Sequence, residues 1–320
     1  MFDVIVSRKV REATDIFSFE LVRADGAELP PFTAGAHIDV YVPDGPVRQY
    51  SLCNPPGERH RYMIAVLREP QSRGGSIALH DRVDEGERLT IGAPRNLFPL
   101  AEDGGRTVLL AGGIGVTPLL SMAEALAQRG AEFELHYCAR TPERMAFGDR
   151  IRASTFADRA SFHFDDGADA QRLRLDVVLG GARAGTHVYV CGPAGFIDHV
   201  LKTARELGWQ DEQLHREYFT ADPTASDAGD SFQVRIASSG RVFEIPEGQS
   251  VVSVLAAAGI EIPVSCEEGM CGSCATPVLE VQGEIDHRDM FLSNKQHAEN
   301  KVFTPCCSRA RAGGLLVLDL

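Results

Sequence analysis

The chain has 320 residues, of which 44% are hydrophobic, and a formal net charge of −13 at pH 7. This length favours two or three domains, and the acidic balance disfavours a nucleic-acid partner. No run approaches about 18 consecutive apolar residues and the N-terminal segment lacks the apolar stretch of a signal peptide, so we expect no membrane partner. Eight cysteines without such a signal favour the reducing cytoplasm over a disulfide framework.

Residues 1–102 are predicted to form an antiparallel β-barrel. Short alternating strands separated by Gly, Pro and Asp turns are expected at 2–6, 17–22, 37–42, 49–53 and 61–66. Two motifs stand out there, Arg48-Gln49-Tyr50-Ser51 on a strand and Arg73-Gly74-Gly75-Ser76 before a helix-like stretch.

Both motifs suit an anionic, ring-bearing ligand. Arg48 can form charge-assisted bonds to a phosphate, and the Gly75–Ser76 backbone at a helix start offers a second anion cradle. Tyr50 has the flat face needed beside a ring system. Taken alone, an R-x-Y-S sequence in a barrel is more often an ordinary strand, so its meaning depends on the rest of the chain.

Residues 103–222 are predicted to form a doubly wound parallel α/β domain. Strands are expected at 107–113, 133–139, 162–166 and 187–193, and helices at 117–127 and 196–207. The glycines of the 110–118 segment (L-A-G-G-I-G-V-T-P) permit a ligand to approach the backbone. Thr117 is expected to cap the following helix and Pro118 to take its first position, which leaves N–H groups for a pyrophosphate.

A tight strand-to-helix turn is the alternative for that glycine segment. The sequence Cys191-Gly192-Pro193 ends a second strand of the same domain. Ligands of such folds bind at the carboxyl ends of the strands, where both motifs should meet. This coincidence favours nucleotide binding.

Residues 223–230 have linker composition, and 231–320 are predicted to form an α+β domain that carries a [2Fe–2S] cluster. Cys266, Cys271 and Cys274 show the C-x4-C-x2-C spacing of a plant-type cluster, and a fourth ligand follows at Cys306 or Cys307. Spacing alone does not separate these two neighbours. Zinc is the competing metal, but adjacent cysteines chelate one tetrahedral ion poorly. Buried or disulfide-linked cysteines are the remaining alternative.

Six motifs occur in a characteristic order: R-Q-Y-S, R-G-G-S, A-G-G-I-G-V-T-P, C-G-P, H-R-E-Y-F and C-C-S-R-A followed by L-V-L-D-L. In this order the chain resembles the phthalate dioxygenase reductase family, which includes vanillate O-demethylase reductases, over essentially its full length. The resemblance implies an FMN-binding β-barrel, an NADH-binding α/β domain and a ferredoxin-like (β-grasp) [2Fe–2S] domain.

The resemblance also implies a role for each motif residue. It places Arg48 at the FMN phosphate, Tyr50 and Ser51 near the isoalloxazine, and Phe219 over the flavin where nicotinamide enters. The complete implied flavin and nucleotide set is Arg48, Gln49, Tyr50, Ser51, Ala65, Val66, Leu67, Gly74, Gly75, Ser76, Gly113, Gly115, Thr117, Cys191, Gly192, Pro193 and Phe219. Ser51, Cys191 and Phe219 are expected at the place of hydride transfer. For Phe219, a core aromatic at a domain boundary is the competing interpretation. The family's C-x-S-R-A tail favours Cys306 over Cys307 as the fourth ligand.

Electron counting gives the expected mechanism. NADH delivers two electrons as a hydride, a [2Fe–2S] cluster accepts one at a time, and flavin can convert between the two. The resemblance therefore implies the reductase component of a two-component Rieske-type oxygenase system, either an aromatic dioxygenase or an O-demethylase. NADH over NADPH and FMN over FAD rest on the resemblance, and Arg140 is a candidate contact for a 2′-phosphate.

Other functions stay open at this point. The acceptor could instead be a quaternary-amine Rieske monooxygenase or a P450. A [2Fe–2S] redox sensor or binding module would keep the cluster without flavin turnover, although its flavin motif would then be degraded. We expect a cytoplasmic monomer.

Overall fold

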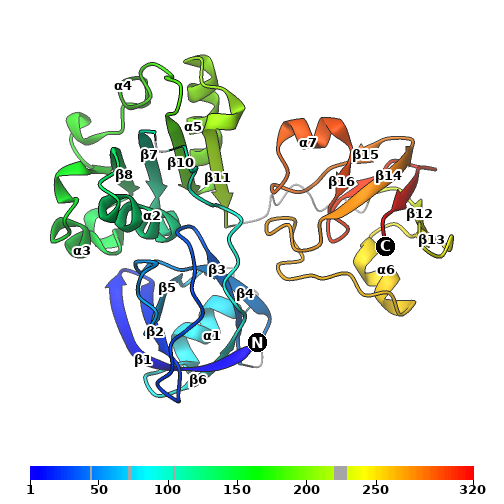
Figure 1. Ribbon diagram of the computed structural model, residues 1–320, viewed down its shortest axis with the longest axis horizontal. Coiled ribbons are helices and arrows are strands. Elements are labelled where there is room, and N and C mark those ends of the chain that lie inside the picture. The colour runs from blue at the N-terminus through cyan, green and yellow to red at the C-terminus, as the bar shows by residue number, and fades with distance from the viewer. Residues whose placement is uncertain (44, 71–73, 104, 220–228) are drawn as a thin grey trace. The chain divides into compact units, whose positions relative to one another are not determined.

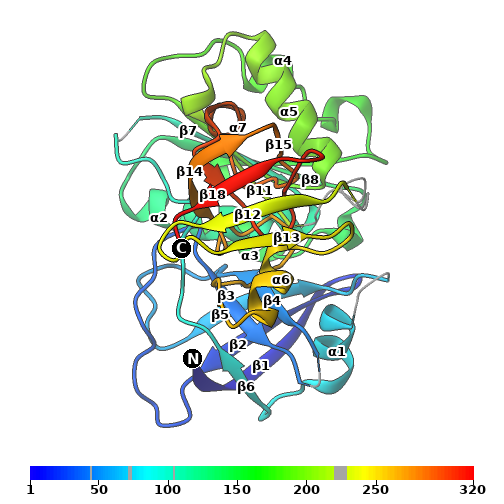
Figure 2. The same cartoon turned by 90° about the vertical axis from the view of Figure 1, so that its right-hand side faces the viewer.

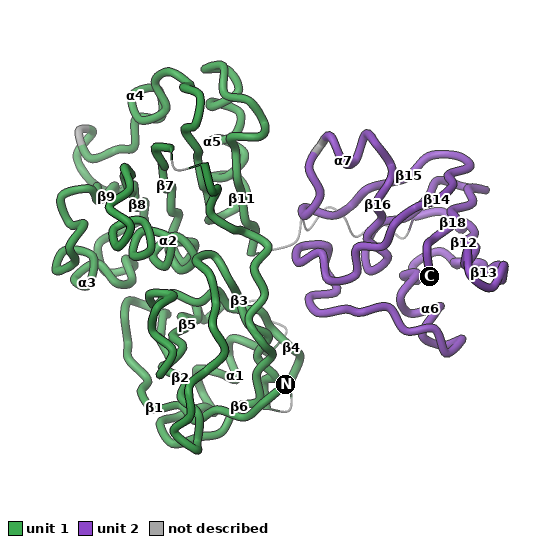
Figure 3. The backbone as a smooth tube through the Cα atoms, in the orientation of Figure 1, with its two compact units in different colours: residues 1–219 green, residues 220–320 purple. Residues whose placement is uncertain are grey.

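The computed structural model describes residues 1–43, 45–70, 74–103, 105–219 and 229–320. Arg73 of the R-G-G-S motif and most of the predicted linker 223–230 lie outside the described residues. The chain divides into two compact units, 1–219 and 220–320 (Figure 3). Within the described ranges, no helix combines the length and the apolar character needed to cross a membrane.

The N-terminal part of the first unit is a curled antiparallel sheet, as predicted (Figure 1). Its strand order is β4-β3-β6-β1-β2-β5. The Cys53 N–H, just after β4, donates to Met63 O on β5 at 2.9 Å, so the two edge strands approach each other. The bounds are β1 (Phe2–Ala13), β2 (Ile16–Val22), β3 (His37–Tyr41), β4 (Val47–Ser51), β5 (Tyr62–Leu67) and β6 (Arg88–Ile91).

Alternation along these strands builds the core of the curled sheet. Val4 and Val6 on β1 and Phe19 and Leu21 on β2 are fully buried, as period-two patterning requires. Helix α1 (Gly75–Arg82) lies against β5, and the His80 ring nitrogen Nε2 lies 2.8 Å from Val66 O.

The second half of the first unit is a parallel sheet in the order β11-β10-β7-β8-β9. Helix α2 and side chains of the antiparallel sheet cover one face, and α4 and α5 cover the other. Both faces are therefore apolar, which explains the nearly continuous hydrophobic strands. The bounds are β7 (Thr107–Gly112), α2 (Val116–Gln128), β8 (Phe133–Ala139), α3 (Gly148–Arg152), β9 (Ala160–Phe164), α4 (Leu175–Val178), β10 (His187–Gly192), α5 (Ala194–Glu206) and β11 (Leu214–Tyr218).

The expected start of α2 is wrong. A 3-10 turn (Gly113–Gly115) leads directly into the helix, which begins at Val116. Thr117 therefore lies inside the first turn, where its hydroxyl donates to Ile114 O at 3.0 Å instead of capping an N–H group. Pro118 takes the third helical position. Glycine backbone, not a threonine side chain, makes the transition from strand to helix.

The second unit is an α+β fold in which strands are ordered β13-β12-β18-β14-β16 (Figure 2). β12 pairs with β18 in parallel, whereas the β12–β13 and β14–β18 pairs are antiparallel. Helix α6 contributes Val251 and Leu255 to the core. The bounds are β12 (Phe232–Ile236), β13 (Val242–Ile245), α6 (Val251–Ala257), β14 (Thr276–Gln282), β15 (Ile285–Asp286), α7 (Asn294–Glu299), β16 (Val302–Phe303), β17 (Arg309–Ala310) and β18 (Leu315–Leu318).

Arg309 forms hydrogen bonds that link the beginning of this unit, at Asp230, to its interior. Its guanidinium donates to the carbonyls of Asp230 and Pro246, each at 2.9 Å, and to that of Gln249. It also lies over the Phe232 ring, with Cζ 5.1 Å from the ring centroid. The side chain is buried, so these carbonyls replace the water that a guanidinium would otherwise bind.

Candidate functional site

A cationic side chain and a helix start meet in the antiparallel part of the first unit. A Cβ atom added to Gly75 would lie 2.8 Å from Arg48 Cγ, so the glycine leaves the room that the arginine stem occupies. Gly74 precedes it with a left-handed φ of 101°. The pairing of a guanidinium with backbone N–H groups at the start of α1 suits a phosphate.

Two neighbouring motif residues make internal contacts. Ser76 Oγ accepts from the Glu69 N–H at 3.1 Å, and Gln49 Nε2 donates to Asp39 Oδ1 at 3.2 Å. Tyr50 packs against the core of the curled sheet, and burial raises the pKa of its hydroxyl. A neutral tyrosine ring beside Arg48 offers a flat surface for stacking.

The three β5 residues of the expected flavin set face two ways. Val66 is fully buried in the core of the curled sheet, and its carbonyl meets His80. Ala65 and Leu67 belong instead to the core shared with the parallel sheet. Because side chains alternate along a strand, Ala65 and Leu67 share the face toward the nucleotide half and Val66 points away from it.

The glycine segment and the C-G-P motif meet at the carboxyl edge of the parallel sheet. A Cβ atom on Gly115 would lie 2.3 Å from Cys191 O and 2.6 Å from Gly192 N. A Cβ atom on Gly192 would come within 2.9 Å of Gly112 Cα. No other residue fits where two backbones approach this closely, so glycine keeps the 3-10 turn and the end of β10 in direct contact.

Ser51, Cys191 and Glu217 come together beside this edge. Cys191 and Glu217 are register partners on β10 and β11, and the Ser51 hydroxyl donates to Glu217 Oε2 at 3.4 Å. Burial raises the pKa of the Glu217 carboxyl to about 8, although the bond from Ser51 opposes this shift. Burial also raises the pKa of the Cys191 thiol well above its ordinary value. At neutral pH both groups are largely protonated and can donate hydrogen bonds.

Glu217 is a residue that the sequence analysis missed. It stands inside the H-R-E-Y-F motif, but its pairing with Cys191 and its contact with Ser51 cannot be seen in the local sequence. Phe219 follows β11 and is partly buried against the core that α2 shares with both sheets. Ser51, Cys191 and Phe219, expected at the place of hydride transfer, thus all lie where the two halves of the first unit meet.

In the second unit, the cysteines converge in one pocket. Cys271 and Cys274 are buried, and Cys274 Sγ lies 3.3 Å from Cys306 Sγ. The N–H groups of Glu268 and Ser273 point at the sulfurs of Cys266 and Cys271, both at 3.4 Å. Sulfurs grouped this way and supplied with backbone N–H groups match what an iron–sulfur cluster requires of its protein.

The loop that carries these cysteines depends on left-handed backbone. Gly269 has a φ of 73° and Gly272 a φ of 65°. A Cβ atom on Gly269 would lie 2.5 Å from Cys307 Sγ and 3.0 Å from Asp289 Cα. The loop therefore packs directly on the segment behind it.

The Cys307 thiol interacts with the neighbouring Cys306 thiol and also has polar contacts of its own. Its Sγ lies 3.6 Å from Thr304 Oγ1 and 3.8 Å from Ser308 Oγ, on the side of Gly269. A hollow of about 480 Å³ opens next to Cys306 and is lined by Gly248, Gln249, Ser250, Val252, Ser253, Glu267 and Cys306. Adjacent cysteines thus have different surroundings.

Comparisons with known proteins agree with this division of the chain. Residues 234–311 match the 2Fe-2S iron-sulfur cluster binding domain family, and residues 94–214 match the N-terminal domain of the dimethylamine monooxygenase subunit DmmA-like family. Vanillate O-demethylase oxidoreductase of Pseudomonas sp. (strain HR199 / DSM 7063) is 54% identical over 320 residues, which is 100% of both chains.

Two solved structures extend the similarity. A phthalate dioxygenase reductase, described as a modular structure for electron transfer from pyridine nucleotides to [2Fe-2S], is 40% identical with a TM-score of 0.73 and covers 100% of this chain and 98% of its own. An intact type IV self-sufficient cytochrome P450 monooxygenase is 36% identical with a TM-score of 0.85, where the match covers 99% of this chain and 41% of the P450 chain.

The fold and the cysteine pocket define an iron–sulfur oxidoreductase that takes electrons from a pyridine nucleotide. The chain belongs to the phthalate dioxygenase reductase family, together with the vanillate O-demethylase oxidoreductases. The predicted fold class, enzyme class and [2Fe–2S] domain are confirmed, and the fold of this family binds FMN and NADH. The roles of individual residues and the three domain boundaries stay predictions.

Proposed function

We propose that this protein is the reductase component of a Rieske-type oxygenase system that demethylates or dioxygenates an aromatic substrate. The observation that carries the proposal is the 54% identity to a vanillate O-demethylase oxidoreductase over the whole of both chains. The motif residues for phosphate, nicotinamide and cluster are all present in that span. Vanillate O-demethylation is the first system to test.

The chain's own residues have separable tasks in this function. Arg48 and the Gly75–Ser76 backbone would bind the FMN phosphate, with Tyr50 beside the ring system. The glycine turn before α2 would bind the nucleotide phosphates, and Cys191, Gly192 and Pro193 would border the nicotinamide. Flavin, when bound, accepts a hydride and passes electrons on singly. Ser51, Cys191 and Glu217 hold protons in a buried edge and exclude water from it.

Cys266, Cys271, Cys274 and Cys306 would hold the [2Fe–2S] cluster. The 3.3 Å approach of Cys306 Sγ to Cys274 Sγ supports Cys306 as the fourth ligand. The contacts of Cys307 with Thr304 and Ser308 support a separate role for that thiol. Acidic residues spread over the chain, with a net charge of −13, would complement a basic patch on the oxygenase.

The test is reconstitution. Purified protein with NADH should reduce cytochrome c or ferricyanide, and should support vanillate turnover when mixed with a vanillate O-demethylase oxygenase component. Flavin-loaded protein without NADH-driven reduction would contradict the reductase function and favour a redox sensor. Turnover of cytochrome c without support of the oxygenase would leave the reductase function intact and reject the partner.

A P450 acceptor is the second candidate, because a solved self-sufficient P450 chain contains a region that matches 99% of this chain. A quaternary-amine Rieske monooxygenase is a further acceptor to include in the same assay. Comparing NADH with NADPH, and replacing Arg140 by alanine, would decide the nucleotide preference. Chromatography of the released flavin separates FMN from FAD. The expected monomeric state is checked by light scattering.

A further inference from the structure

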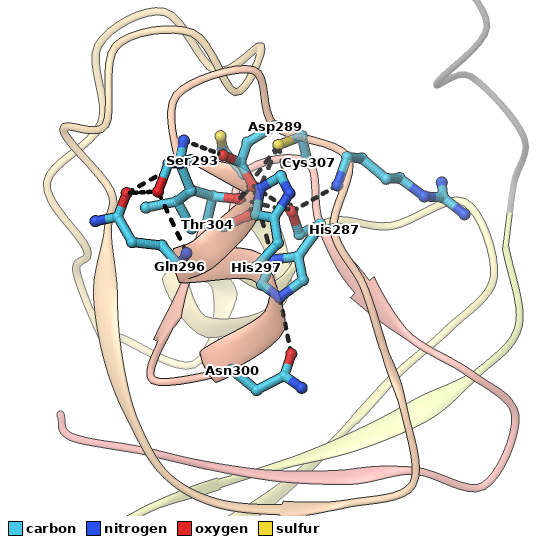
Figure 4. A network of polar contacts seen from close by, with 12 residues as sticks. His287, Asp289, Ser293, Gln296, His297, Asn300, Thr304 and Cys307 are labelled. Atoms are coloured by element: carbon cyan, nitrogen blue, oxygen red, sulfur yellow. Dashed lines mark hydrogen bonds and ion pairs between the residues drawn. The ribbon is translucent and has the colours of Figure 1, made fainter. Parts of the chain in front are cut away.

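A buried polar network lies behind the cysteine loop of the second unit, and Asp289 is its centre (Figure 4). The Asp289 side chain has no solvent exposure. A carboxylate buried this deeply is retained only where hydrogen bonds replace its hydration. Its hydrogen bonds lead to the Leu292 backbone, to helix α7 and to the turn from Thr304 to Ser308.

The first set of bonds reaches the turn that carries Cys306. Thr304 Oγ1 donates to Asp289 Oδ1 at 3.1 Å, and Ser308 Oγ lies 3.4 Å from the same oxygen. The two hydroxyls are 2.6 Å apart. Thr304 O also accepts the N–H groups of Cys307 and Ser308, at 3.2 and 3.0 Å. The carboxylate therefore fixes both ends of the turn in which Cys306 sits.

The second set reaches the cysteine loop and helix α7. The Met290 N–H donates to Gly269 O at 3.1 Å, and Gly269 packs on Asp289 Cα. Asp289 Oδ2 accepts the Leu292 N–H at 2.7 Å, and His297 Nε2 lies 3.2 Å from Oδ1. Asp289 and its neighbour Met290 thus join the loop of the first three cysteines to the turn of the fourth.

The charge state of the network agrees with this geometry. Burial by itself would raise the pKa of the Asp289 carboxyl, but the His287 side chain, the Leu292 N–H and His297 outweigh it and hold the pKa at about 2. The group is therefore a carboxylate that accepts bonds through both oxygens.

A mononuclear metal site does not explain the same residues. His287, Asp289 and His297 offer ligand atoms within 4.8 Å of one another. However, the two imidazoles stack with centroids 4.4 Å apart and planes inclined by only 16°. Nearly parallel rings direct their lone pairs into separate planes, so one ion cannot lie in the plane of both.

We propose that Asp289 is a positioning residue of the cluster pocket, which fixes the turn bearing Cys306 against the loop bearing Cys266, Cys271 and Cys274. The inference rests on the proposed function in taking these four cysteines as the ligands. Hydrogen-bonded residues behind metal ligands typically change metal affinity by roughly 10–100-fold when they are replaced. Asp289 acts through the backbone that carries the ligands and not as a ligand itself.

Asp289→Asn is the decisive variant. An amide keeps the shape but loses the charge and one of the two acceptor oxygens, so it cannot accept from both Leu292 and Thr304. In the full-length holoprotein, we expect the visible absorbance of the cluster to bleach at least roughly tenfold faster in excess EDTA. We also expect shifted g values in the electron paramagnetic resonance spectrum after dithionite reduction, which a remote stability defect would not produce. Flavin reduction by NADH in the first unit should stay at the wild-type rate.

Asp319→Asn is the matched control, because it removes an exposed carboxylate from the same unit and should leave bleaching and spectrum unchanged. Thr304→Val keeps the side-chain shape and deletes one bond to Asp289, so a smaller acceleration is expected. It decides the matter if Asp289→Asn does not fold.

The inference would be overturned if Asp289→Asn bleached at the wild-type rate and gave an unchanged spectrum. If Asp289→Asn does not fold, the same result in Thr304→Val would overturn it. Equally accelerated bleaching in Asp319→Asn would overturn it as well. A wild-type protein that binds flavin but shows no cluster absorbance would overturn the proposed function and this inference together.

Discussion

The nucleotide edge and the cysteine pocket are built by opposite means. At the nucleotide edge, Gly115 brings two backbones into contact, and the nearby titratable side chains, Cys191 and Glu217, are held largely uncharged by burial. In the cysteine pocket, a fully buried carboxylate joins three segments through hydrogen bonds. The nucleotide edge is thus shaped by glycine, which has no side chain, whereas the cysteine pocket is shaped by an ionised carboxylate.

The difference follows from what each site holds. A nucleotide must enter and leave at every turnover, and bare backbone allows close approach without a side chain to move aside. A cluster remains bound, and its ligands must keep one geometry through repeated one-electron steps. Fixing them with a charge-assisted network costs desolvation once, during folding.

The largest effect is expected in the cysteine pocket. Cys306→Ser should abolish or severely destabilise the cluster, because its sulfur lies 3.3 Å from Cys274 Sγ, whereas Cys307→Ser should keep it. Iron content and the visible spectrum measure the outcome. Flavin reduction by NADH should persist in both variants. The reverse result, with loss only in Cys307→Ser, would show that the ligand assignment is wrong.

At the nucleotide edge, Gly115→Ala should push β10 away from the 3-10 turn, because the new Cβ would lie 2.3 Å from Cys191 O. We expect a loss of about 1–3 kcal/mol in the free energy of unfolding. The rate of flavin reduction by NADH should fall roughly 100-fold, since misplacement by about 1 Å has this effect on a transfer step. Gly195→Ala is the control, because nothing lies within 4 Å of its added Cβ and it sits in helix α5. A wild-type rate of flavin reduction by NADH in Gly115→Ala would show that this backbone contact does not determine hydride transfer.

Glu217→Gln tests whether burial keeps this carboxyl neutral. Its pKa in the folded protein, about 8, exceeds the ordinary value of 4.5, so the unfolded chain ionises first as pH rises. The wild-type free energy of unfolding should therefore fall between about pH 4.5 and 8, relative to Glu217→Gln, by at most a few kcal/mol. Thermal unfolding of the flavin-free protein across this range measures it. Glu102→Gln, at an exposed position of the same unit, should follow the wild type. Parallel profiles for wild type and Glu217→Gln would contradict the raised pKa.

Ser51→Ala should have the smallest effect. It removes a 3.4 Å bond that lowers the pKa of Glu217, so the midpoint of the pH profile should move to higher pH. The change in unfolding free energy at pH 7 should be below about 1 kcal/mol. Ser7→Ala, at an exposed position on β1, is the control. A midpoint that moves to lower pH would show that the bond does not act on the carboxylate.

Local pattern was enough to predict most of the fold. The strands around 17–22, 37–42 and 133–139 and the helix around 196–207 were visible as alternation or as amphipathic periodicity, and the structure has elements there. The short elements α3, β15 and β17 escaped because two to five residues carry too little periodicity. Helix α7 had a signal that went unused, a capping box between Ser293 and Gln296.

Site residues were found where a motif is local and missed where a contact is long-range. Cysteine spacing identified the pocket, but the contacts of Cys307 with Thr304 and Ser308 could not be seen in spacing. Glu217 meets Ser51 across 166 positions of the chain. The Asp289 network likewise joins residues from 269 to 308, and no single segment reveals it.

The anchoring of Asp230 by Arg309 matters for anyone who divides this protein into fragments. A fragment of the second unit that starts at 231, the domain boundary suggested by composition, removes the Asp230 carbonyl from the buried guanidinium. A start at Gly229 or earlier retains that acceptor and the glycine that packs on Arg309 and Arg288. The two residues Gly229 and Asp230 at the N-terminus of the fragment thus decide whether Arg309, three positions after Cys306, keeps its hydrogen-bond acceptors.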